Sequence, residues 1–373
     1  MLGVYVHLPF CPYICPYCDF AKWPYKASAA AGYLQALHKE IAAAESVPAS
    51  SIFLGGGTPN TYDARELAAL LDAIATKFPA DGAREVSIEV NPELVAADDL
   101  KRYAGLGVTR LSIGVQSFHP PEIATLGRRH APADVTRVVS QARAAGLTVS
   151  LDLMFAVPGQ TSESWRDSLR SAIDLGVDHV STYGLTVEEG TPFAFWQQRD
   201  PGAFFDDTLE ARFYGDAIDL LESAGFEHYE ISNFAKPGHR CAHNLNYWEN
   251  GEYVGLGVGA ASYREGVRWV HTRRLDEYLA AALGGTEIPS EAERLEGTRR
   301  AGEAVMLALR TAQGVCLTQF KERYGLDFLE FYSSIVTRFC EEGLLELDAR
   351  NVRLTRRGRF LANDVCEAFV TQP

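Results

Sequence analysis

Three of the seven cysteines lie close together near the start of the chain, at positions 11, 15 and 18. The spacing Cys-x-x-x-Cys-x-x-Cys gathers three thiolates in one loop, and a 4Fe-4S cluster normally takes four cysteine ligands. Cys11, Cys15 and Cys18 would therefore hold three irons and leave the fourth iron open to another ligand.

A zinc ion is the alternative occupant of this loop. Structural zinc takes four protein ligands, and its cysteines come in closely spaced pairs. The remaining cysteines are scattered, so no second pair is present, and His7 and Asp19 are the nearby side chains that could complete a zinc site. The spacing favours the cluster.

Two glycine-rich stretches could bring the backbone close to a ligand. Gly-Gly-Gly-Thr-Pro at 55–59 lacks the lysine of a phosphate-binding loop, so it is either a tight turn or a ligand contact. The stretch at 255–260 matches the dinucleotide-binding pattern, but no amphipathic helix follows at 261–272. We interpret that second stretch as a packed turn.

The elements that must position these residues alternate between short β-branched runs and amphipathic helical stretches such as 28–44, 64–78 and 132–145. Six strand-helix units in tandem predict an α/β fold with parallel strands, either an open sheet or a barrel. We expect a partial (β/α)6 barrel. Its predicted strands are residues 4–7, 51–54, 85–90, 110–114, 148–154 and 179–185.

Polar residues follow these strands at their carboxyl ends, where ligands bind in parallel sheets and barrels. The cysteine loop follows the first strand and the first glycine turn follows the second. Glu89, Gln116 and Asp152 lie at the ends of the next three strands, and residues 186–190 end the sixth. Singly, the two acids could be helix caps, but the convergence predicts one site built from six loops.

A compact polar and aromatic motif, His-Asn-Leu-Asn-Tyr-Trp, occupies residues 243–248, two residues after Cys241. Histidine is an axial ligand of haem iron, and aromatic rings offer flat faces to a macrocycle. The alternative for His243 is a hydrogen-bonded core residue. From spacing alone the motif indicates a candidate haem site and no more.

The last quarter of the chain has a different pattern. Helical stretches at 298–310, 317–324 and 328–342 precede two short strands at 344–347 and 352–354 and a final helix at 355–370. This order predicts a mainly helical, winged-helix-like domain, with residues 284–293 as the linker. The predicted domains are a barrel at 1–195, a barrel extension carrying the histidine motif at 196–290, and the helical domain at 291–373.

The composition is that of a globular protein, with 47% hydrophobic and 23% charged residues among 373. The net charge of −14 repels phosphate backbones, so no nucleic-acid partner is expected. No apolar run approaches the roughly 18 residues that span a bilayer, which predicts no integral membrane segment. The start of the chain lacks a basic segment and the cysteines form no disulfide framework, so we expect a cytoplasmic protein.

With these motifs in view, the chain resembles the radical S-adenosylmethionine superfamily, and within it the oxygen-independent coproporphyrinogen III oxidase-like group. The resemblance runs from Tyr5 to the last helix. It is carried by Tyr-Val-His-Leu-Pro-Phe-Cys at 5–11, the first glycine turn, Arg-Leu-Ser-Ile-Gly-Val-Gln-Ser-Phe at 110–118, Asp-Leu-Met-Phe-Ala-Val-Pro-Gly-Gln at 152–160, the histidine motif, and Leu-Thr-Arg-Arg-Gly-Arg-Phe-Leu-Ala-Asn-Asp at 354–364.

The resemblance implies a radical S-adenosylmethionine barrel and assigns roles to residues. The three cysteines would hold a 4Fe-4S cluster, and S-adenosylmethionine would chelate the open iron. Tyr17 would lie beside its adenine, and Gly56, Gly57 and Thr58 would line its methionyl end. The rest of S-adenosylmethionine would contact Tyr5, Glu89, Gln116, Arg128 and Asp152.

Within this group the chain is most similar to the haem-chaperone branch, whose haem-binding motif the 243–248 segment matches. The resemblance implies haem contacts from His243, Asn244, Tyr247 and Trp248, and transfer of haem to an unidentified acceptor, such as a respiratory protein. One departure is Gly-Val-Gly-Ala-Ala-Ser at 257–262, where the group often has Gly-Pro-Gly-Ala-His-Ser. Any contact made by that histidine is absent here.

The main alternative is an oxygen-independent coproporphyrinogen III dehydrogenase, and a radical methyltransferase is a third. Oxidases of the group carry a further cysteine two residues after the third, where this chain has Phe20. They also carry a segment before the first strand, whereas ten residues precede Cys11 here. A radical reaction needs a site closed against water. We therefore expect haem carriage without dehydrogenase activity.

Overall fold

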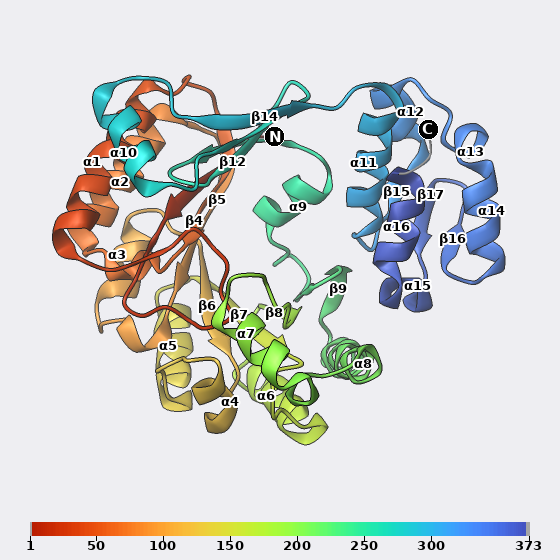
Figure 1. Cartoon of the computed structure of the whole chain (residues 1–373), viewed down its shortest axis with the longest axis horizontal. Coiled ribbons are helices and arrows are strands. Elements are labelled where there is room, and N and C mark those ends of the chain that lie inside the picture. Colours follow the sequence, from red (N-terminus) through yellow and green to blue (C-terminus); the bar gives the residue numbers. More distant parts are fainter. Residues whose placement is uncertain (1, 371–373) are drawn as a thin grey trace.

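The computed structural model describes residues 2–370, and its main feature is a wall of parallel strands that curves into a partial barrel (Figure 1). Adjacent strands of this wall follow one another in the chain, and each neighbouring pair is parallel. This arrangement confirms the predicted fold class. The six strands are β1 (Leu2–Leu8), β4 (Ala49–Gly56), β5 (Ala80–Val90), β6 (Arg110–Gln116), β7 (Thr148–Phe155) and β8 (His179–Gly184).

The side chains of each strand alternate between the helix layer and the barrel interior, because successive residues point to opposite faces of a strand. In β6, Leu111, Ile113 and Val115 are buried in the main hydrophobic core. The alternate residues Arg110 and Ser112 instead line the barrel cavity, as do Gly114 and Gln116 further along. Packing against helices therefore stabilises the outer face, while the inner face is left free to carry chemistry.

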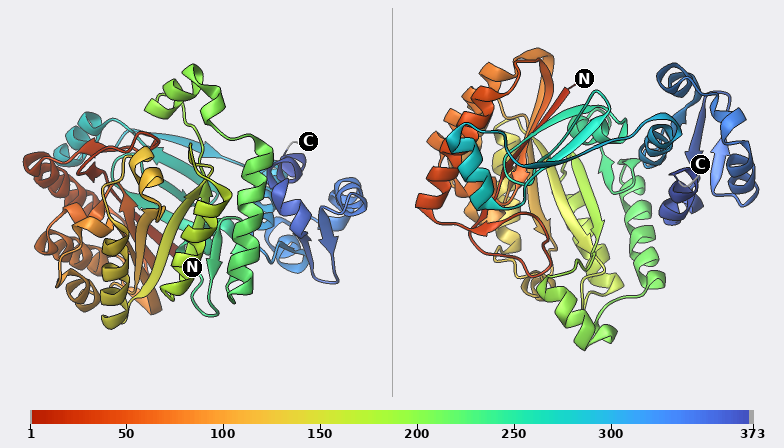
Figure 2. Two further views of the ribbon diagram at one scale, coloured as in Figure 1. Left: turned by 90° about the horizontal axis from the view of Figure 1, so that it is seen from below. Right: turned by 45° about the horizontal axis from the view of Figure 1, so that its top comes forward.

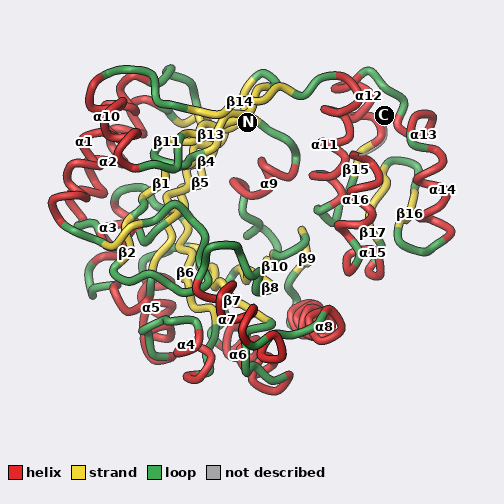
Figure 3. The backbone as a smooth tube through the Cα atoms, viewed as in Figure 1, coloured by secondary structure: helices red, strands yellow, loops and turns green. Residues whose placement is uncertain are grey.

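Helices connect the strands and cover the outside of the barrel (Figures 2 and 3). Local signals set their ends: the Asp63 side chain accepts hydrogen bonds from the backbone N–H groups of Arg65 and Glu66, and the Glu66 side chain accepts one from the Asp63 N–H, which forms a capping box. The covering helices are α1 (Ala27–Ala43), α2 (Ala64–Lys77), α3 (Asp99–Gly105), α5 (Pro132–Ala144), α6 (Ser162–Asp174) and α8 (Asp207–Ser223). Shorter segments are β2 (Phe10–Cys11), β3 (Trp23–Pro24), η1 (Pro59–Thr61), η2 (Pro92–Leu94), α4 (Pro120–Thr125), α7 (Pro192–Arg199) and η3 (Pro201–Ala203).

The middle of the chain extends the same sheet at both edges into twelve strands. β11 (Glu252–Leu256) pairs in parallel with β1 and is followed by the antiparallel strands β12 (Ala261–Arg264), β13 (Val267–His271) and β14 (Ser290–Arg294). At the other edge, β10 (Asn233–Ala235) pairs antiparallel with β8 and with β9 (Glu227–Glu230). The two helices here are α9 (Ala242–Trp248) and α10 (Leu275–Gly284). The glycine stretch at 255–260 leads into β12 rather than a helix, as expected.

The segment expected to be a linker, 284–293, is a connection only at 285–289, because Gly284 ends α10 and the last four residues belong to the sheet. Its second half enters β14, which pairs with β13 from Val267 opposite Arg294 to His271 opposite Ser290. All five residues of β14 are exposed and three of them are charged. Charged side chains are a common protection of an edge strand, and they gave this strand the composition of a loop.

The C-terminal domain, coloured blue in Figure 1, has a hydrophobic core of its own. It contains a three-stranded sheet in the order β15-β17-β16, one strand more than the predicted ribbon. Two predicted helices are each divided, at Tyr332 and at Leu361. The elements are α11 (Gly297–Leu309), β15 (Val315–Cys316), α12 (Leu317–Tyr324), α13 (Phe328–Phe331), α14 (Ser333–Glu341), β16 (Leu345–Leu347), β17 (Asn351–Leu354), α15 (Arg356–Phe360) and α16 (Ala362–Val370). Within residues 2–370, no helix is long and apolar enough to cross a membrane.

Candidate functional site

One cavity of about 820 Å³ occupies the interior of the barrel. This volume lies toward the upper end of the roughly 300–1,000 Å³ of ligand sites. Fifteen of the sixteen predicted site residues line it, and Trp248 is the exception. Those lining it are Tyr5, Cys11, Cys15, Tyr17, Cys18, Gly56, Gly57, Thr58, Glu89, Gln116, Arg128, Asp152, His243, Asn244 and Tyr247.

The cavity has two ends, set by the direction of the strands. Loops at the carboxyl ends of the strands bring the three cysteines, the glycine turn, Gln116 and Arg128 to one end, which we call the cluster end. Residues at the amino ends of β6 and β8 form the other end together with α9 and the residue before it, and we call this the α9 end. Its lining residues are Arg110, His179, Cys241, His243 and Tyr247. Glu85 of β5 bonds to Arg110 and to the backbone of α9 there.

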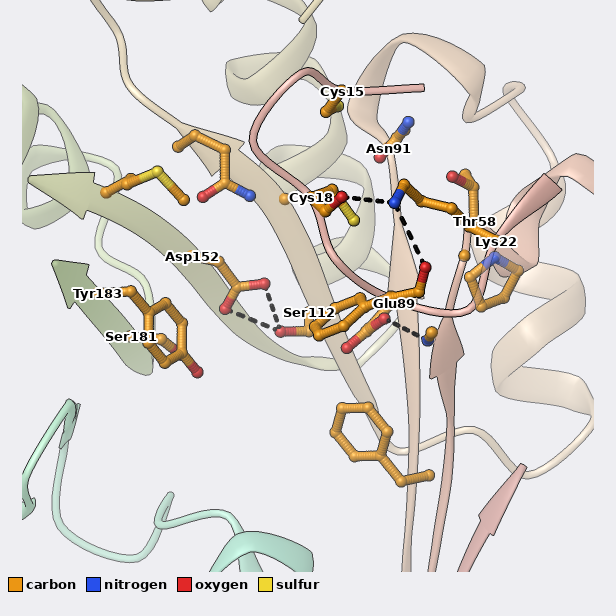
Figure 4. Close-up of a pocket in the computed structure, with 18 of the residues that line it drawn as sticks. Cys15, Cys18, Lys22, Thr58, Glu89, Asn91, Ser112, Asp152, Ser181 and Tyr183 are labelled. Atoms are coloured by element: carbon orange, nitrogen blue, oxygen red, sulfur yellow. Dashed lines mark hydrogen bonds between the residues drawn. The ribbon is translucent and has the colours of Figure 1, made fainter. Parts of the chain in front are cut away.

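The cysteine loop is anchored by backbone hydrogen bonds to the elements beside it. Cys11 lies in β2, which pairs with β3, and the Thr58 N–H donates to the carbonyl of Phe10 at 3.0 Å. All three thiols are free, and Arg128 Nη1 lies 3.9 Å from Cys15 Sγ. Burial raises the pKa of Cys11 to about 11, so iron binding there must release a proton. Figure 4 shows Cys15 and Cys18 on the loop above the acids of the cavity.

The donor set of this loop fits an iron-sulfur cluster better than a single ion. In the part of the chain that the structure describes, no group of three or more histidine, cysteine or acidic side chains is arranged to hold one metal ion. A zinc ion requires its ligands to converge on one point, whereas the cysteines of a cluster bind different irons. Three free thiols in one loop therefore suit the three protein-held corners of a 4Fe-4S cluster.

The glycine turn at the end of β4 fits tightly against β1. A Cβ on Gly56 would lie 2.2 Å from Nδ1 of His7, and one on Gly57 would lie 2.5 Å from the carbonyl oxygen of Leu8. Gly56 also has φ of +100°, which favours glycine. The turn therefore packs tightly on the protein's own first strand and also lines the cavity beside Thr58, and its close approach to a ligand stays a prediction.

Two buried acids lie on the strands that flank β6, Glu89 on β5 and Asp152 on β7. Glu89 Oε2 accepts a hydrogen bond from the Gly56 N–H at 3.0 Å, and both carboxylate oxygens of Asp152 lie 3.1 Å from Ser112 Oγ (Figure 4). Burial raises the pKa of both acids, to about 8 for Glu89, where the Asp152 charge adds to the effect, and to about 6 for Asp152. Neither acid caps a helix. A cationic ligand between them would favour their ionised forms.

Gln116 and Arg128 complete the cluster end. Gln116 has φ of +65° at an irregularity in the pairing of β6 and β7, a conformation that costs energy for a residue other than glycine. Arg128 donates from Nη2 to Asn91 Oδ1 at 2.8 Å and to the Gly114 carbonyl, which aims its guanidinium at the cysteine loop. Strained backbone at a strand end is typical of ligand sites.

Tyr5 lies on β1, and Tyr17 lies in the cysteine loop itself, between Cys15 and Cys18. The hydroxyl of Tyr5 is 2.9 Å from His7 Nδ1, and its ring is stacked 6.4 Å from that of Phe53. Tyr17 packs against Phe193 of α7 with ring centroids 6.2 Å apart. Phe20, at the position of the oxidases' further cysteine, lines the cavity with 63% of its surface exposed.

At the α9 end, His243 is buried and both of its ring nitrogens have partners. Nδ1 lies 2.9 Å from Ser51 Oγ, and Nε2 lies 2.9 Å from the Tyr247 hydroxyl. Its ring also stacks on Phe53 at 5.3 Å. Burial lowers the pKa of His243 to about 4, so the imidazole is neutral. A neutral nitrogen can ligate a metal once the Tyr247 hydroxyl moves away.

A buried charge pair holds α9 in the lumen. Glu85 pairs with Arg110 at 3.1 Å and accepts hydrogen bonds from the backbone N–H groups of Ala242 and His243, each at 3.2 Å. It also accepts one from the thiol of Cys241 at 3.4 Å. The carboxylate therefore satisfies the first turn of α9, whose N–H groups have no partner within the helix.

Trp248 faces away from the cavity, and its position as a haem contact stays a prediction. Residues four apart share a helix face, so His243 and Tyr247 both point into the lumen, whereas Trp248 is turned by about 100° from its neighbour. The guanidinium of Arg310, in the C-terminal domain, lies 5.9 Å from the Trp248 ring. Arg323 also donates to the carbonyl of Glu249 at 2.8 Å. The C-terminal domain thus holds the end of α9.

Several cavity residues do not belong to any motif noted in the sequence. They include Ser150, His179, Ser181 and Tyr183. The signal that could have found them is alternation. Parallel strands covered by helices on both faces are continuously apolar, whereas these strands place a polar residue at every second position, which indicates a polar lumen. Ala261, where related chains often have histidine, also lines the cavity.

The fold and the cysteine loop define the class as the radical S-adenosylmethionine proteins. The family model described as the Radical SAM superfamily matches residues 5–172, and the one described as the HemN C-terminal domain matches residues 295–361. Among solved structures, coproporphyrinogen III oxidase (HemN) from Escherichia coli superposes with a TM-score of 0.86 at 23% identity, covering 99% of this chain and 90% of that one. This likeness shows the fold.

Curated relatives narrow the class. The protein named heme chaperone HemW from Bacillus subtilis is 35% identical, covering 99% of both chains. Those of the same name from Lactococcus lactis and Escherichia coli are 34% and 33% identical, covering 99% and 100% of this chain and 97% and 98% of their own lengths. The chain therefore belongs to the HemW family of the radical S-adenosylmethionine superfamily. Membership of that superfamily implies a 4Fe-4S cluster and S-adenosylmethionine.

Proposed function

We propose that this protein is a haem chaperone that binds haem, a 4Fe-4S cluster and S-adenosylmethionine, and passes haem to an acceptor protein. The observation that carries the proposal is the single cavity: its cluster end holds three free thiols, and its α9 end holds His243, Asn244 and Tyr247. The names of the relatives support the same function.

At the cluster end, Cys11, Cys15 and Cys18 hold the cluster, which supplies an open iron for the methionyl group of S-adenosylmethionine. Gly56, Gly57 and Thr58 would line the methionyl end, and Tyr17 would lie beside the adenine. Gln116, Arg128, Glu89, Asp152 and Tyr5 would contact the rest of S-adenosylmethionine. Ionised carboxylates attract a sulfonium cation, so these acids bind it more tightly once they have lost their protons.

At the α9 end, His243 Nε2 is the proposed contact to haem iron. Because the Tyr247 hydroxyl occupies this nitrogen, haem must displace that hydrogen bond. Asn244 and the ring of Tyr247 line the same wall. Ser51 keeps its hydrogen bond to Nδ1, which fixes the orientation of the imidazole as second partners do for other metal-bound histidines.

The test is anaerobic reconstitution of the full chain, followed by haem titration and a decarboxylation assay on the same preparation. A chaperone binds haem with a defined Soret band and hands it to an apo-protein acceptor. It leaves coproporphyrinogen III unchanged in the presence of reductant and S-adenosylmethionine. Conversion of coproporphyrinogen III to protoporphyrinogen IX would contradict the proposal, as would a preparation that binds no haem.

A further inference from the structure

Arg110 has an unused hydrogen-bond donor group at the α9 end of the cavity. Its Nε pairs with Glu85 at 3.1 Å, and its Nη2 donates to the carbonyls of His239 at 2.8 Å and Arg240 at 3.1 Å. Nη1 is buried and has no hydrogen-bond partner among residues 2–370. The whole side chain is 6% exposed and lines the cavity.

Ser87 provides a second unused donor beside it. The register of the sheet pairs Ser87 with Arg110 on β6 and with Phe53 on β4, and both of those residues line the cavity. Ser87 therefore shares the lumen-facing side of the sheet. It is fully buried, and its Oγ has no partner in the described chain. A buried donor without an acceptor costs free energy, and two neighbouring ones indicate a missing acceptor.

The charged groups around Arg110 favour the binding of an anion. Glu85 is the nearest carboxylate, but it already accepts hydrogen bonds from the first turn of α9 and from Cys241 as well as from Arg110. His179 is bonded to Ser150 and Tyr229 through its two nitrogens and carries no charge, because burial and then Arg110 lower its pKa well below the usual value. Arg110 is therefore a positively charged side chain at the α9 end that still has a free N–H group.

We propose that Arg110 Nη1, together with Ser87 Oγ, binds the carboxylate of a haem propionate, so that haem enters the barrel with a propionate leading. This inference rests on the proposed function, which places haem in this cavity. Glu85 contacts both Arg110 Nε and the backbone N–H of His243, so the carboxylate site and the iron contact are one side chain apart. A carboxylate accepts well from a guanidinium and a hydroxyl at once.

The competing orientation has the propionates at the cluster end of the cavity. There Lys22 is a cation beside the cysteine loop, with its Nζ donating to the carbonyls of Cys18 and Phe20 (Figure 4). The two orientations use different cations and can be separated by substitution. Ser87→Ala is the cleanest variant, because the Ser87 hydroxyl bonds to nothing in the described chain and its loss leaves the fold intact.

The experiment compares iron protoporphyrin IX with its dimethyl ester, which keeps the macrocycle and iron but has no carboxylates. Both are titrated into the anaerobically reconstituted full chain and into Ser87→Ala, Arg110→Gln and Lys22→Gln. We expect the wild type to bind the diacid about tenfold or more tightly than the diester, as hydrogen bonds to a charged group do. Ser87→Ala should reduce this ratio severalfold, Arg110→Gln should abolish it, and Lys22→Gln should leave it unchanged.

Equal affinity of the wild type for the diacid and the diester would overturn the carboxylate site while leaving haem binding in place. Loss of the preference for the diacid in Lys22→Gln but not in Ser87→Ala would also overturn the carboxylate site, since the propionates would then lie at the cluster end. If neither porphyrin binds, the proposed function itself fails. Should Arg110→Gln not fold, as judged by circular dichroism, the wild type and Ser87→Ala still decide the result.

Discussion

The two ends of the barrel cavity differ in how their ligand-binding groups are already bonded within the protein. At the cluster end, three thiols are free, two acids have raised pKa values, and Gln116 is held in a strained conformation. At the α9 end, His243 has partners on both nitrogens and Glu85 is fully engaged, with Arg110 Nη1 and Ser87 Oγ as the unused groups. The thiols of the cluster end are free to bind iron. At the α9 end, haem iron must replace the hydrogen bond between His243 Nε2 and the Tyr247 hydroxyl.

This difference separates resident cofactors from cargo. A site binds its ligand tightly when few internal contacts have to be broken. A site whose ligand atom is already bonded binds more weakly and releases more easily, which is what a carrier of haem requires. The Tyr247 hydroxyl at Nε2 of His243 therefore acts as an internal competitor, and substitutions at the two ends should have opposite kinds of effect.

The largest effect is expected from Cys18→Ser, which removes one of three protein ligands to the cluster. Iron content and visible absorption of the anaerobically reconstituted protein should fall to background. Cys340→Ser is the control, because Cys340 belongs to α14 in the C-terminal domain and should leave both quantities unchanged. Full iron content in Cys18→Ser would show that the cluster lies elsewhere.

Glu89→Gln should lower the affinity for S-adenosylmethionine on the order of tenfold to a hundredfold, because a charged partner of the ligand is lost. The wild-type affinity should rise between pH 6 and pH 8 as Asp152 and then Glu89 ionise, and the variant should show a weaker rise. Calorimetric titration at both pH values measures this. Affinity independent of pH and of the substitution would exclude Glu89 from the site.

Glu89→Gln should also raise the free energy of unfolding of the ligand-free protein at alkaline pH. The folded pKa of Glu89, about 8, lies above its unfolded value, so its contribution to stability falls as pH rises toward 8, by up to about 1.4 kcal/mol per pH unit. Glu40 is a matched control: it is buried away from the cavity, with a pKa raised by burial to about 7. Glu40→Gln should share the gain in thermal stability at pH 8 and keep normal S-adenosylmethionine affinity.

At the α9 end, His243→Ala and Tyr247→Phe should act in opposite directions. The first removes the proposed iron contact and should weaken haem binding about tenfold with an altered Soret band. The second frees Nε2 from a hydrogen bond worth about 1 kcal/mol and should strengthen haem binding about fivefold. Spectrophotometric titration with the cluster intact measures both. Weaker binding in Tyr247→Phe would mean that the hydroxyl assists haem rather than competing with it.

The smallest effect on haem is expected from Trp248→Leu. The ring contacts Arg310 rather than the cavity, so haem affinity should stay within about twofold of wild type. Stability should fall instead, by about 1 kcal/mol for the lost cation–π contact and burial. Urea unfolding and haem titration separate the two readouts. A large loss of haem affinity at unchanged stability would place Trp248 at the haem after all.

Much of the fold could be predicted from the sequence, because its signals are local. The alternation of β-branched runs with amphipathic stretches determined the six barrel strands, since each must bury one face against a helix. The cysteine spacing indicated the cluster for the same reason: three ligands in one loop need no tertiary structure to bring them together. The sequence did not predict β14, because the charged residues that protect this edge strand resemble a loop. It also did not predict the breaks in the helices at Tyr332 and Leu361, because these depend on packing rather than on local pattern.

Only the tertiary structure decided which side chains share the lumen and what each is bonded to. Glu85, Arg110 and Cys241 are separated by up to 156 positions and meet because strand register and the course of α9 bring them together. The orientation of Trp248 toward the C-terminal domain and the occupied nitrogens of His243 follow from the same packing. Residue types therefore predicted the chemistry at the cluster end, while contacts between distant segments set the state of the α9 end.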